Sequence, residues 1–199
     1  MKTLIPFILS LVIVSFSYSQ AEKKLSNEDY LILNVFLEQQ KFVHLDLSII
    51  NTNKSDSTFF LNSYNRDLQL YNSFKDGCIE QLREKDTLDY DTNFLCSLAK
   101  TFESHKNLFS QEELVFYSSA LQKGKNITYT IDFDKILIPT IFPLTKEIGN
   151  DKNRIKIHGL YYNDSRDKVL IKYAFNQKHL FHVIKKEDGW WRSIGNFAM

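Results

Sequence analysis

The spacing of apolar residues changes its period along the chain. Up to Gly124 apolar residues recur mostly at spacings of three and four, which favours amphipathic helices over 25–40, 58–73, 94–102 and 110–123. Beyond Gly124 they alternate with polar residues, which favours strands over 127–133, 154–162, 168–176, 179–186 and 190–194. The sequence therefore predicts an α+β fold, with N-terminal helices packed on a C-terminal antiparallel β-meander.

Local signals mark several ends of these elements. Ser26 is placed to cap the first helix, and Ser110 with Glu113 has the spacing of a capping box at the start of the fourth. The pair Asp76-Gly77 predicts the end of the second helix, and a short helix followed by an acidic loop is expected over 78–91. One early strand is expected around 44–49, where His44, Asp46 and Ser48 alternate with apolar residues.

Asp188-Gly189 between two β-rich runs predicts a tight hairpin with a two-residue turn. That turn sets Glu187 opposite Trp190 and Lys186 opposite Trp191. Side chains alternate across a strand, so one face of the hairpin carries the residues assigned here to the core, namely Phe181, Val183, Trp190 and Ile194.

The opposite face of the hairpin carries His182, Lys186 and Trp191 among apolar neighbours. Helices or a loop can cover this face, in which case these residues belong to the interior. Alternatively, the face is a partly exposed aromatic patch around Trp191 that binds a protein or a small ligand. Lys186 would then lie over the indole ring without any bound cation.

The first nineteen residues have the pattern of an export signal. Lys2 provides a positive charge, residues 4–14 are almost wholly apolar, and Ser17-Tyr18-Ser19 fits the cleavage preference of signal peptidase. The apolar run is shorter than the roughly 20 residues that span a bilayer, so we expect cleavage and no stable membrane anchor. The expected organisation is a signal peptide over 1–19 and a single α+β domain over 20–199, located in the periplasm or secreted.

Composition narrows the classes of partner. The chain has 16 Phe, 10 Tyr and 2 Trp but only 6 Gly, which suits a packed interior and not a phosphate-binding loop. Without Lys2, 24 basic residues face 24 acidic ones. A neutral chain gives no electrostatic reason to expect binding to nucleic acid or to an anionic membrane.

The two cysteines, Cys78 and Cys96, both follow the leader. In an oxidising compartment an isolated pair is more often a disulfide than two free thiols, so a disulfide is expected. Two buried free thiols are the alternative.

Established catalytic, nucleotide-binding and metal-binding motifs are absent from the sequence, so no cofactor and no metal is expected. His44 and Asp46 share one face of the expected early strand, which is the minimum geometry for a catalytic His–carboxylate pair. The alternative interpretation is that the same two residues are ordinary polar side chains on a solvent-exposed face of a sheet.

The last sixty or so residues resemble the C-terminal part of uncharacterised small exported proteins of Bacteroidota-type bacteria. The matching pieces are residues 138–142, 169–173 and 185–190, and the leader ending at Ser19-Gln20 is similar as well. A Cys-Gly element that commonly follows the middle strand in those proteins is replaced here by residues 174–177. The resemblance implies a location and a fold but no activity.

Taken together, the sequence favours an exported, non-catalytic binding or interaction protein. A hydrolase whose site is assembled only in the fold is the first alternative, with His44 and Asp46 as its candidate residues. A neutralising partner of a toxin or protease is the second alternative.

Overall fold

A computed structural model describes residues 24–51, 56–84, 90–123, 127–144 and 153–198. The expected signal peptide over 1–19 lies outside these residues. The helices are α2 (Asn27–Glu38), α3 (Asp56–Glu84), α4 (Tyr90–Lys106), α5 (Gln111–Lys123) and the short 3-10 helix η1 (Phe133–Lys135). The strands are β1 (Val43–Leu45), β2 (Ser48–Asn51), β3 (Ile127–Thr130), β4 (Ile141–Pro143), β5 (Arg154–Tyr162), β6 (Lys168–Phe175), β7 (Lys178–Glu187) and β8 (Trp190–Ala198). The chain has a mixed α+β fold, as the sequence predicts.

Six strands form the main sheet in the order β4-β1-β5-β6-β7-β8, and β2 pairs with β3 in a separate two-stranded ribbon. The stretch from β5 to β8 is the predicted antiparallel meander. The whole sheet is mixed, because β1 lies parallel to both of its neighbours, β4 and β5. The sheet edge at β4 contains Pro143, and an edge strand tolerates proline because it needs fewer backbone donors than a central one.

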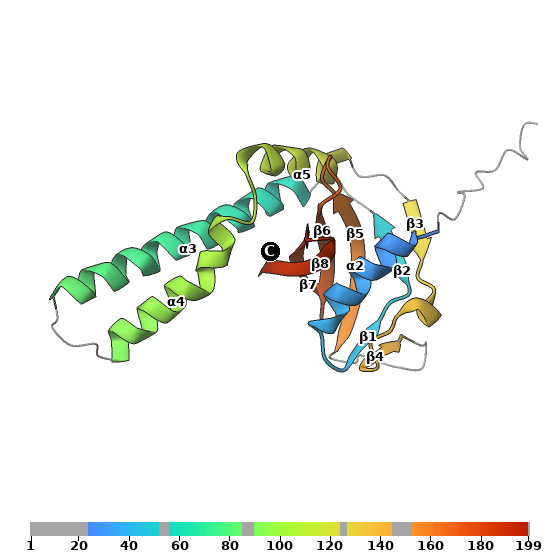
Figure 1. The fold of residues 1–199 in the computed structure, drawn as a ribbon, viewed down its shortest axis with the longest axis horizontal. Coiled ribbons are helices and arrows are strands. Elements are labelled where there is room, and N and C mark those ends of the chain that lie inside the picture. Colours follow the sequence, from blue (N-terminus) through green and yellow to red (C-terminus); the bar gives the residue numbers. More distant parts are fainter. Residues whose placement is uncertain (1–23, 52–55, 85–89, 124–126, 145–152, 199) are drawn as a thin grey trace, which may run out of the picture.

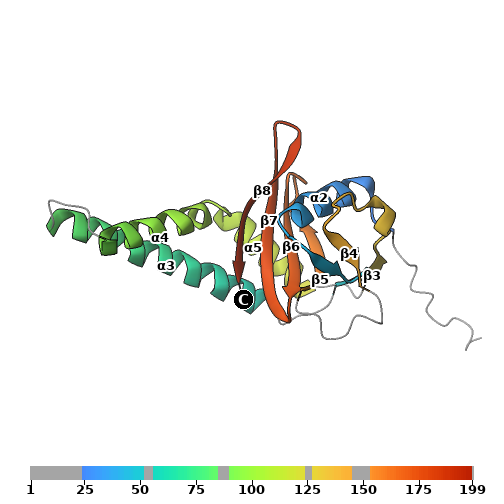
Figure 2. The same ribbon diagram turned by 90° about the horizontal axis from the view of Figure 1, so that it is seen from below.

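Helices cover both faces of the main sheet (Figure 1; Figure 2). On one face α2 packs through a core that includes Phe36, Ile171 and Trp191. On the other face α3 and α5 pack through a second core that includes Phe60, Tyr117 and Phe181. The alternation of apolar residues along each strand produces this arrangement, since odd and even positions of a buried strand enter different cores.

Helices α3 and α4 form an antiparallel pair that extends away from the sheet, here called the helical arm (Figure 1). The prediction that α3 ends at Asp76-Gly77 is wrong, and Cys78–Glu84 continues it as helix. A Cβ atom on Gly77 would lie 3.4 Å from a methyl carbon of Leu95, so the small residue suits the close approach of α4. Packing against α4 offsets the roughly 1 kcal/mol that glycine costs within a helix. None of the helices in the described ranges combines the length and the apolar run needed to cross a membrane.

A disulfide joins the two helices of the arm, as expected. The sulfur atoms of Cys78 and Cys96 are 2.00 Å apart, and their Cα atoms are 5.0 Å apart. Among the arm side chains whose burial the structure describes, Tyr71 on α3 and Ala99 on α4 are the main deeply buried ones beyond the sheet. The disulfide therefore supports a part of the fold that has little hydrophobic core of its own.

The predicted helix caps are present. Ser26 and Asp29 form a capping box at the start of α2, in which the Asp29 backbone amide donates to Ser26 Oγ and the Ser26 amide donates to the Asp29 carboxylate. Ser110 and Glu113 form the equivalent box at α5. Each cap satisfies backbone amides that would otherwise lack a partner.

The strand expected around 44–49 is two short strands in different sheets. Asp46 separates them, because its carboxylate accepts hydrogen bonds from the backbone amide and the hydroxyl of Ser48. This local turn redirects the chain from β1 to β2.

The β7–β8 hairpin has the predicted turn and register near its tip. Asp188 and Gly189 both have positive φ, and Lys186 pairs with Trp191 while Glu187 pairs with Trp190. Further from the turn the pairing shifts, and Val183 lies opposite Gly195 where the sequence predicts Ile194. A Cβ atom on Gly195 would lie 2.7 Å from a methyl carbon of Leu108, so the close approach of that side chain accompanies the bulge.

Candidate functional site

The face of the hairpin that carries Trp191 is covered by α2. Trp191 is 9% exposed and belongs to the core beneath that helix, and His182 is 1% exposed. Lys186 is more accessible, with its ammonium 5.4 Å from the centre of the Trp191 ring and 3.4 Å from the Glu28 carboxylate. The structure thus agrees with the covered alternative for this face, and the exposed patch around Trp191 is wrong. A binding role for Trp191, His182 or Lys186 stays a prediction.

Trp190 is the exposed tryptophan of the pair. Its side chain is 73% exposed, so the assignment of Trp190 to the core is wrong, whereas Phe181 and Val183 of the same predicted face are buried. The reason is the length of the hairpin, whose tip extends beyond the helices that cover the sheet (Figure 2). We call residues 185–192 the hairpin tip.

The hairpin tip carries charged residues around Trp190. Glu187 lies directly opposite Trp190, and Lys185 lies opposite the exposed Arg192. A 3.3 Å ion pair joins the Lys185 ammonium to the Glu187 carboxylate. Cross-strand neighbours on one face lie within contact distance, so these groups surround the indole ring with both signs of charge.

His182 and Ser193 form a hydrogen-bonded pair between β7 and β8. The Ser193 hydroxyl lies 2.9 Å from Nε2 of His182, and the imidazole ring packs against Phe36 of α2. Burial lowers the pKa of His182 to about 4, so the ring is neutral near pH 7 and a weak base. Its Nδ1 atom has no hydrogen-bond partner among the described residues, so no carboxylate orients the ring as a catalytic triad requires.

His44 and Asp46 follow each other along β1 and its exit, but the Asp46 carboxylate is bound elsewhere. It lies 3.2 Å from the Arg154 guanidinium and 3.7 Å from the Lys156 ammonium. Burial raises the pKa of Asp46, but the hydrogen bonds from Ser48 and the two cations outweigh it and leave the pKa below its ordinary value. The His44 ring lies 5.7 Å from that of Phe142. This carboxylate is therefore held as an ion-pair partner, which does not favour the hydrolase interpretation.

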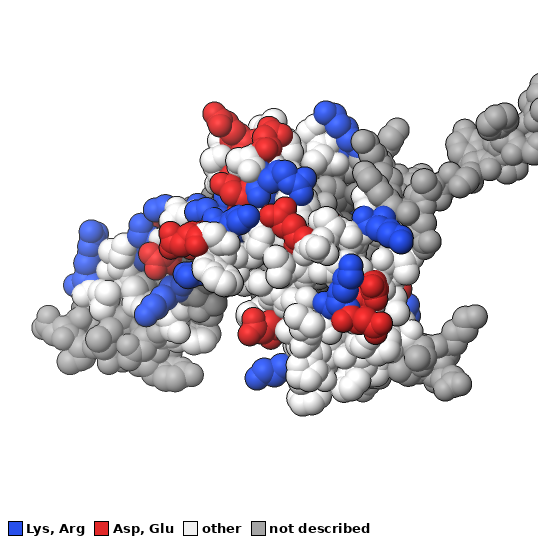
Figure 3. All heavy atoms as spheres, turned by 45° about the vertical axis from the view of Figure 1, so that its right-hand side comes forward, with Lys and Arg blue, Asp and Glu red and all other residues white. Residues whose placement is uncertain are grey.

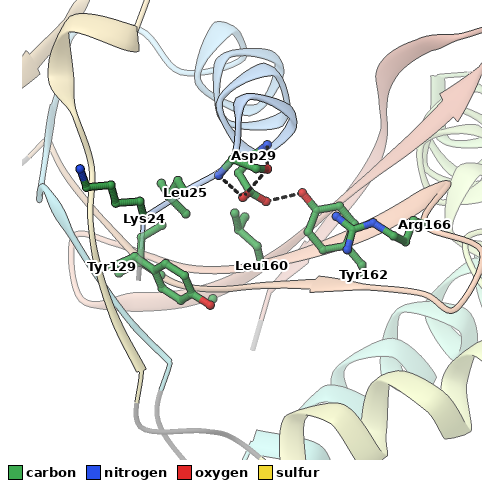
Figure 4. Close-up of a pocket in the computed structure, with 10 residues that line it drawn as sticks. Lys24, Leu25, Asp29, Tyr129, Leu160, Tyr162 and Arg166 are labelled. Carbon is green, nitrogen blue, oxygen red and sulfur yellow. Dashed lines mark hydrogen bonds between the residues drawn. The ribbon is translucent and has the colours of Figure 1, made fainter. Parts of the chain in front are cut away.

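A cavity of about 340 Å³ lies at the N-terminal end of α2. Its walls come from four places in the fold: the start of α2, the end of β5, the β2–β3 ribbon and the β5–β6 turn (Figure 4). Leu25, Ile49 and Leu160 provide apolar surface, and Leu160 lies between Tyr129 on one side and Tyr162 on the other (Figure 4). The size is at the lower end of the range of small-molecule sites.

The acceptor atoms of the cavity are already engaged. One Asp29 carboxylate oxygen accepts the hydrogen bond of the Tyr162 hydroxyl, and the other accepts bonds from the backbone and the hydroxyl of Ser26. Burial and the negative charge of Asp29 raise the pKa of Tyr162, so its hydroxyl remains a donor. Asp29 therefore acts as a structural link between α2 and β5.

Arg166 borders the cavity from the β5–β6 turn. Its guanidinium carbon lies 4.3 Å from the centre of the Tyr162 ring, and one nitrogen lies 3.5 Å from the Glu28 carboxylate. The backbone of Arg166 has φ of 54°, a left-handed conformation that costs a non-glycine residue about 1 kcal/mol or more. The turn thus holds a strained arginine over an aromatic ring at the edge of a cavity.

Burial also raises the pKa of Tyr129 on the ribbon, with a further contribution from the negative charge of Asp29. The Tyr129 hydroxyl makes no hydrogen bond with any residue that the structure describes. It remains available as a donor at the wall opposite Tyr162.

Neither the distribution of charged side chains nor that of potential metal ligands indicates a further site among the described residues. Basic and acidic side chains are interspersed on the face shown in Figure 3, in keeping with the neutral composition. Within the described ranges no group of three or more His, Cys, Asp and Glu side chains could hold a metal ion.

Comparison with known proteins yields no family model, no curated protein and no solved structure that matches this chain. The candidate site therefore has to be judged on its geometry alone.

The sequence predictions missed the cavity and the exposure of Trp190. The cavity joins Asp29, Tyr129 and Arg166 from three segments that are far apart along the chain, and no short motif links them. A signal for Trp190 does exist in the sequence, because it follows the turn glycine directly and therefore lies at the end of the hairpin.

Proposed function

We propose that this chain is an exported, non-catalytic interaction domain that binds a protein partner through Trp190 at the hairpin tip. The single observation behind the proposal is that Trp190 is 73% exposed while the adjacent Trp191 is buried. Tryptophan and arginine are the residues that most often dominate binding energy at protein interfaces, and Arg192 lies two residues along the same strand face.

The hairpin presents Trp190 on a firm support. On the opposite side of the tip, Trp191 packs in the core beneath α2 and the Lys186 ammonium lies 3.4 Å from the Glu28 carboxylate. A side chain on a support that is already ordered loses less conformational entropy on binding than one on a loose loop. The charged groups around the ring suit a polar rim that would surround the tryptophan in an interface.

Export is the second half of the proposal. It is supported by the leader pattern over 1–19 and by the disulfide between Cys78 and Cys96, since disulfides persist mainly in oxidising compartments. The ion-paired Asp46 and the neutral, buried His182 favour binding over catalysis.

Capture from the native envelope fraction tests the proposal. The full chain is compared with Trp190→Ala and with a matched truncation of another exposed apolar residue, Leu137→Ala. We expect Trp190→Ala to weaken retention of a specific partner at least tenfold, which corresponds to about 1.4 kcal/mol, while Leu137→Ala retains it. Equal retention by all three proteins would rule out Trp190 as the contact residue.

A further inference from the structure

In the cavity beside Asp29, the hydrogen-bonding groups that remain available are donors and not acceptors. Its carboxylate oxygens are engaged by Ser26 and Tyr162, as described above. The groups left over are donors: the Tyr129 hydroxyl and the guanidinium nitrogens of Arg166 that do not face Glu28. A guanidinium has five N–H donors and no acceptor, so one ion pair leaves most of them available.

The two cations of the lining, Lys24 and Arg166, are accompanied by two carboxylates, Asp29 in the lining and Glu28 beside Arg166. Lys24 lines the cavity and forms no ion pair with any residue in the described ranges. Its side chain extends along the rim away from Tyr162 (Figure 4), so it adds charge near the entrance more than a contact at the centre. A ligand must therefore bring acceptors, and an anionic acceptor fits better than a neutral one.

The remaining lining is apolar. Leu25, Ile49 and Leu160 offer no hydrogen bonds, and the tyrosine rings on either side of Leu160 add aromatic surface (Figure 4). A ligand with an apolar body removes this surface from water, whereas a bare inorganic anion leaves it hydrated.

We propose that the cavity binds a small organic acid, whose carboxylate meets the Arg166 guanidinium at one wall and whose apolar body lies over Leu160 towards the ring of Tyr129. The inference does not depend on the role of Trp190, since the hairpin tip does not line the cavity.

Titration of the full chain with matched acids and amides tests this inference. The probes are benzoate, hexanoate and 3-phenylpropionate, each against its uncharged amide, and binding is followed by calorimetry or ligand-observed NMR. We expect at least one acid to bind saturably with a dissociation constant on the order of 1 mM, which suits a ligand of about ten heavy atoms. Its amide should bind at least fivefold more weakly.

One variant and two controls locate the binding. Arg166→Gly removes the guanidinium and suits the left-handed backbone, so it should stay folded while it binds the acid at least fivefold more weakly. Tyr129→Phe keeps the aromatic ring at the opposite wall and should bind the acid like the parent chain. Gln177→Gly makes the same kind of change at a left-handed position outside the cavity lining, with φ of 70°, and should bind like the parent chain.

Three results would overturn the inference. One is the absence of saturable binding by all three acids. The second is equal binding of acid and amide, which would mean that the cavity recognises no negative charge. The third is unchanged binding by a folded Arg166→Gly variant, which would place the acid elsewhere on the chain.

Discussion

Trp190 and Trp191 are neighbours in the sequence and lie on opposite faces of the β7–β8 hairpin, 73% and 9% exposed respectively. Alternation along a strand explains why they point apart, and the position of α2 explains which of them is buried. Two tryptophans at adjacent positions thus have different surroundings. The ring of Trp191 holds the hairpin to the body of the protein, and the ring of Trp190 lies at its surface.

Alanine substitution should separate the two tryptophans by their effect on stability. Trp191→Ala removes a ring packed under α2 and should lower the free energy of unfolding by about 3 kcal/mol. Trp190→Ala removes a mostly solvated ring and should change it by less than about 0.5 kcal/mol. Urea denaturation of both variants measures the difference, and equal losses would contradict the assignment of the two faces.

His182 should make stability fall in mild acid. Its pKa is about 4 in the folded chain against an ordinary value of 6.5, so between these values the unfolded state binds a proton that the folded state does not. The contribution of neutral His182 to the free energy of unfolding is fully present above pH 6.5. It is lost as the pH falls towards 4, by up to about 3 kcal/mol.

The variant His182→Phe keeps a ring against Phe36 and removes this titration. The carboxylates of the chain titrate in both proteins. A difference between the two proteins in the slope of unfolding free energy against pH is therefore due to His182. Denaturation series at several pH values should give a flatter dependence between pH 6.5 and 4 for the variant. Parallel curves would show that His182 does not carry the effect.

The disulfide should stabilise the helical arm and not the sheet. Replacing both Cys78 and Cys96 with Ser opens a loop with a sequence separation of 18, for which chain entropy gives about 3 kcal/mol. Hydrogen exchange should accelerate in the distal parts of α3 and α4, which have little core of their own, while β5 to β8 keep their protection. Unchanged exchange in the arm would mean that helix packing alone maintains it.

The buried lysine of β6 offers a double-mutant test. The Lys168 ammonium lies 2.7 Å from the Glu113 carboxylate and donates to the Leu108 carbonyl at 3.0 Å. Glu113→Gln leaves that charge without its anionic partner and should cost about 2 kcal/mol, discounted for the partial exposure of Glu113.

Combining Glu113→Gln with Lys168→Met removes the unpaired charge as well. The double variant should therefore be more stable than Glu113→Gln alone, and denaturation of the four proteins in the cycle measures the coupling. Additive losses would indicate that the two side chains stabilise the fold independently.

Local signals in the sequence were sufficient for much of the fold. The capping boxes at Ser26 and Ser110 and the turn at Asp188-Gly189 depend on residues a few positions apart, and all three are present. The break expected at Gly77 is absent, and α3 continues to Glu84 along its contact with α4. Propensity is a local quantity, and tertiary packing overrides it.

Neither the parallel pairing of β1 nor the burial of Trp191 could be predicted from the sequence, because both depend on contacts between residues far apart along the chain. His44 pairs with Arg154, more than a hundred residues later, and no period in the sequence specifies that neighbour. Periodicity correctly places Trp190 and Trp191 on opposite faces, but it does not say how far along the hairpin the helices cover each face. The candidate site depends on that coverage, so it could be predicted only as a pair of alternatives.

Site-specific photocrosslinking in the native cell tests the central proposal most directly. With Trp190→p-benzoylphenylalanine, irradiation should produce a discrete adduct of this chain with one partner protein. The same substitution at Val115, which is 63% exposed on α5, should produce none. No adduct from position 190, or the same adducts from both positions, would contradict the proposal that the hairpin tip is the contact surface.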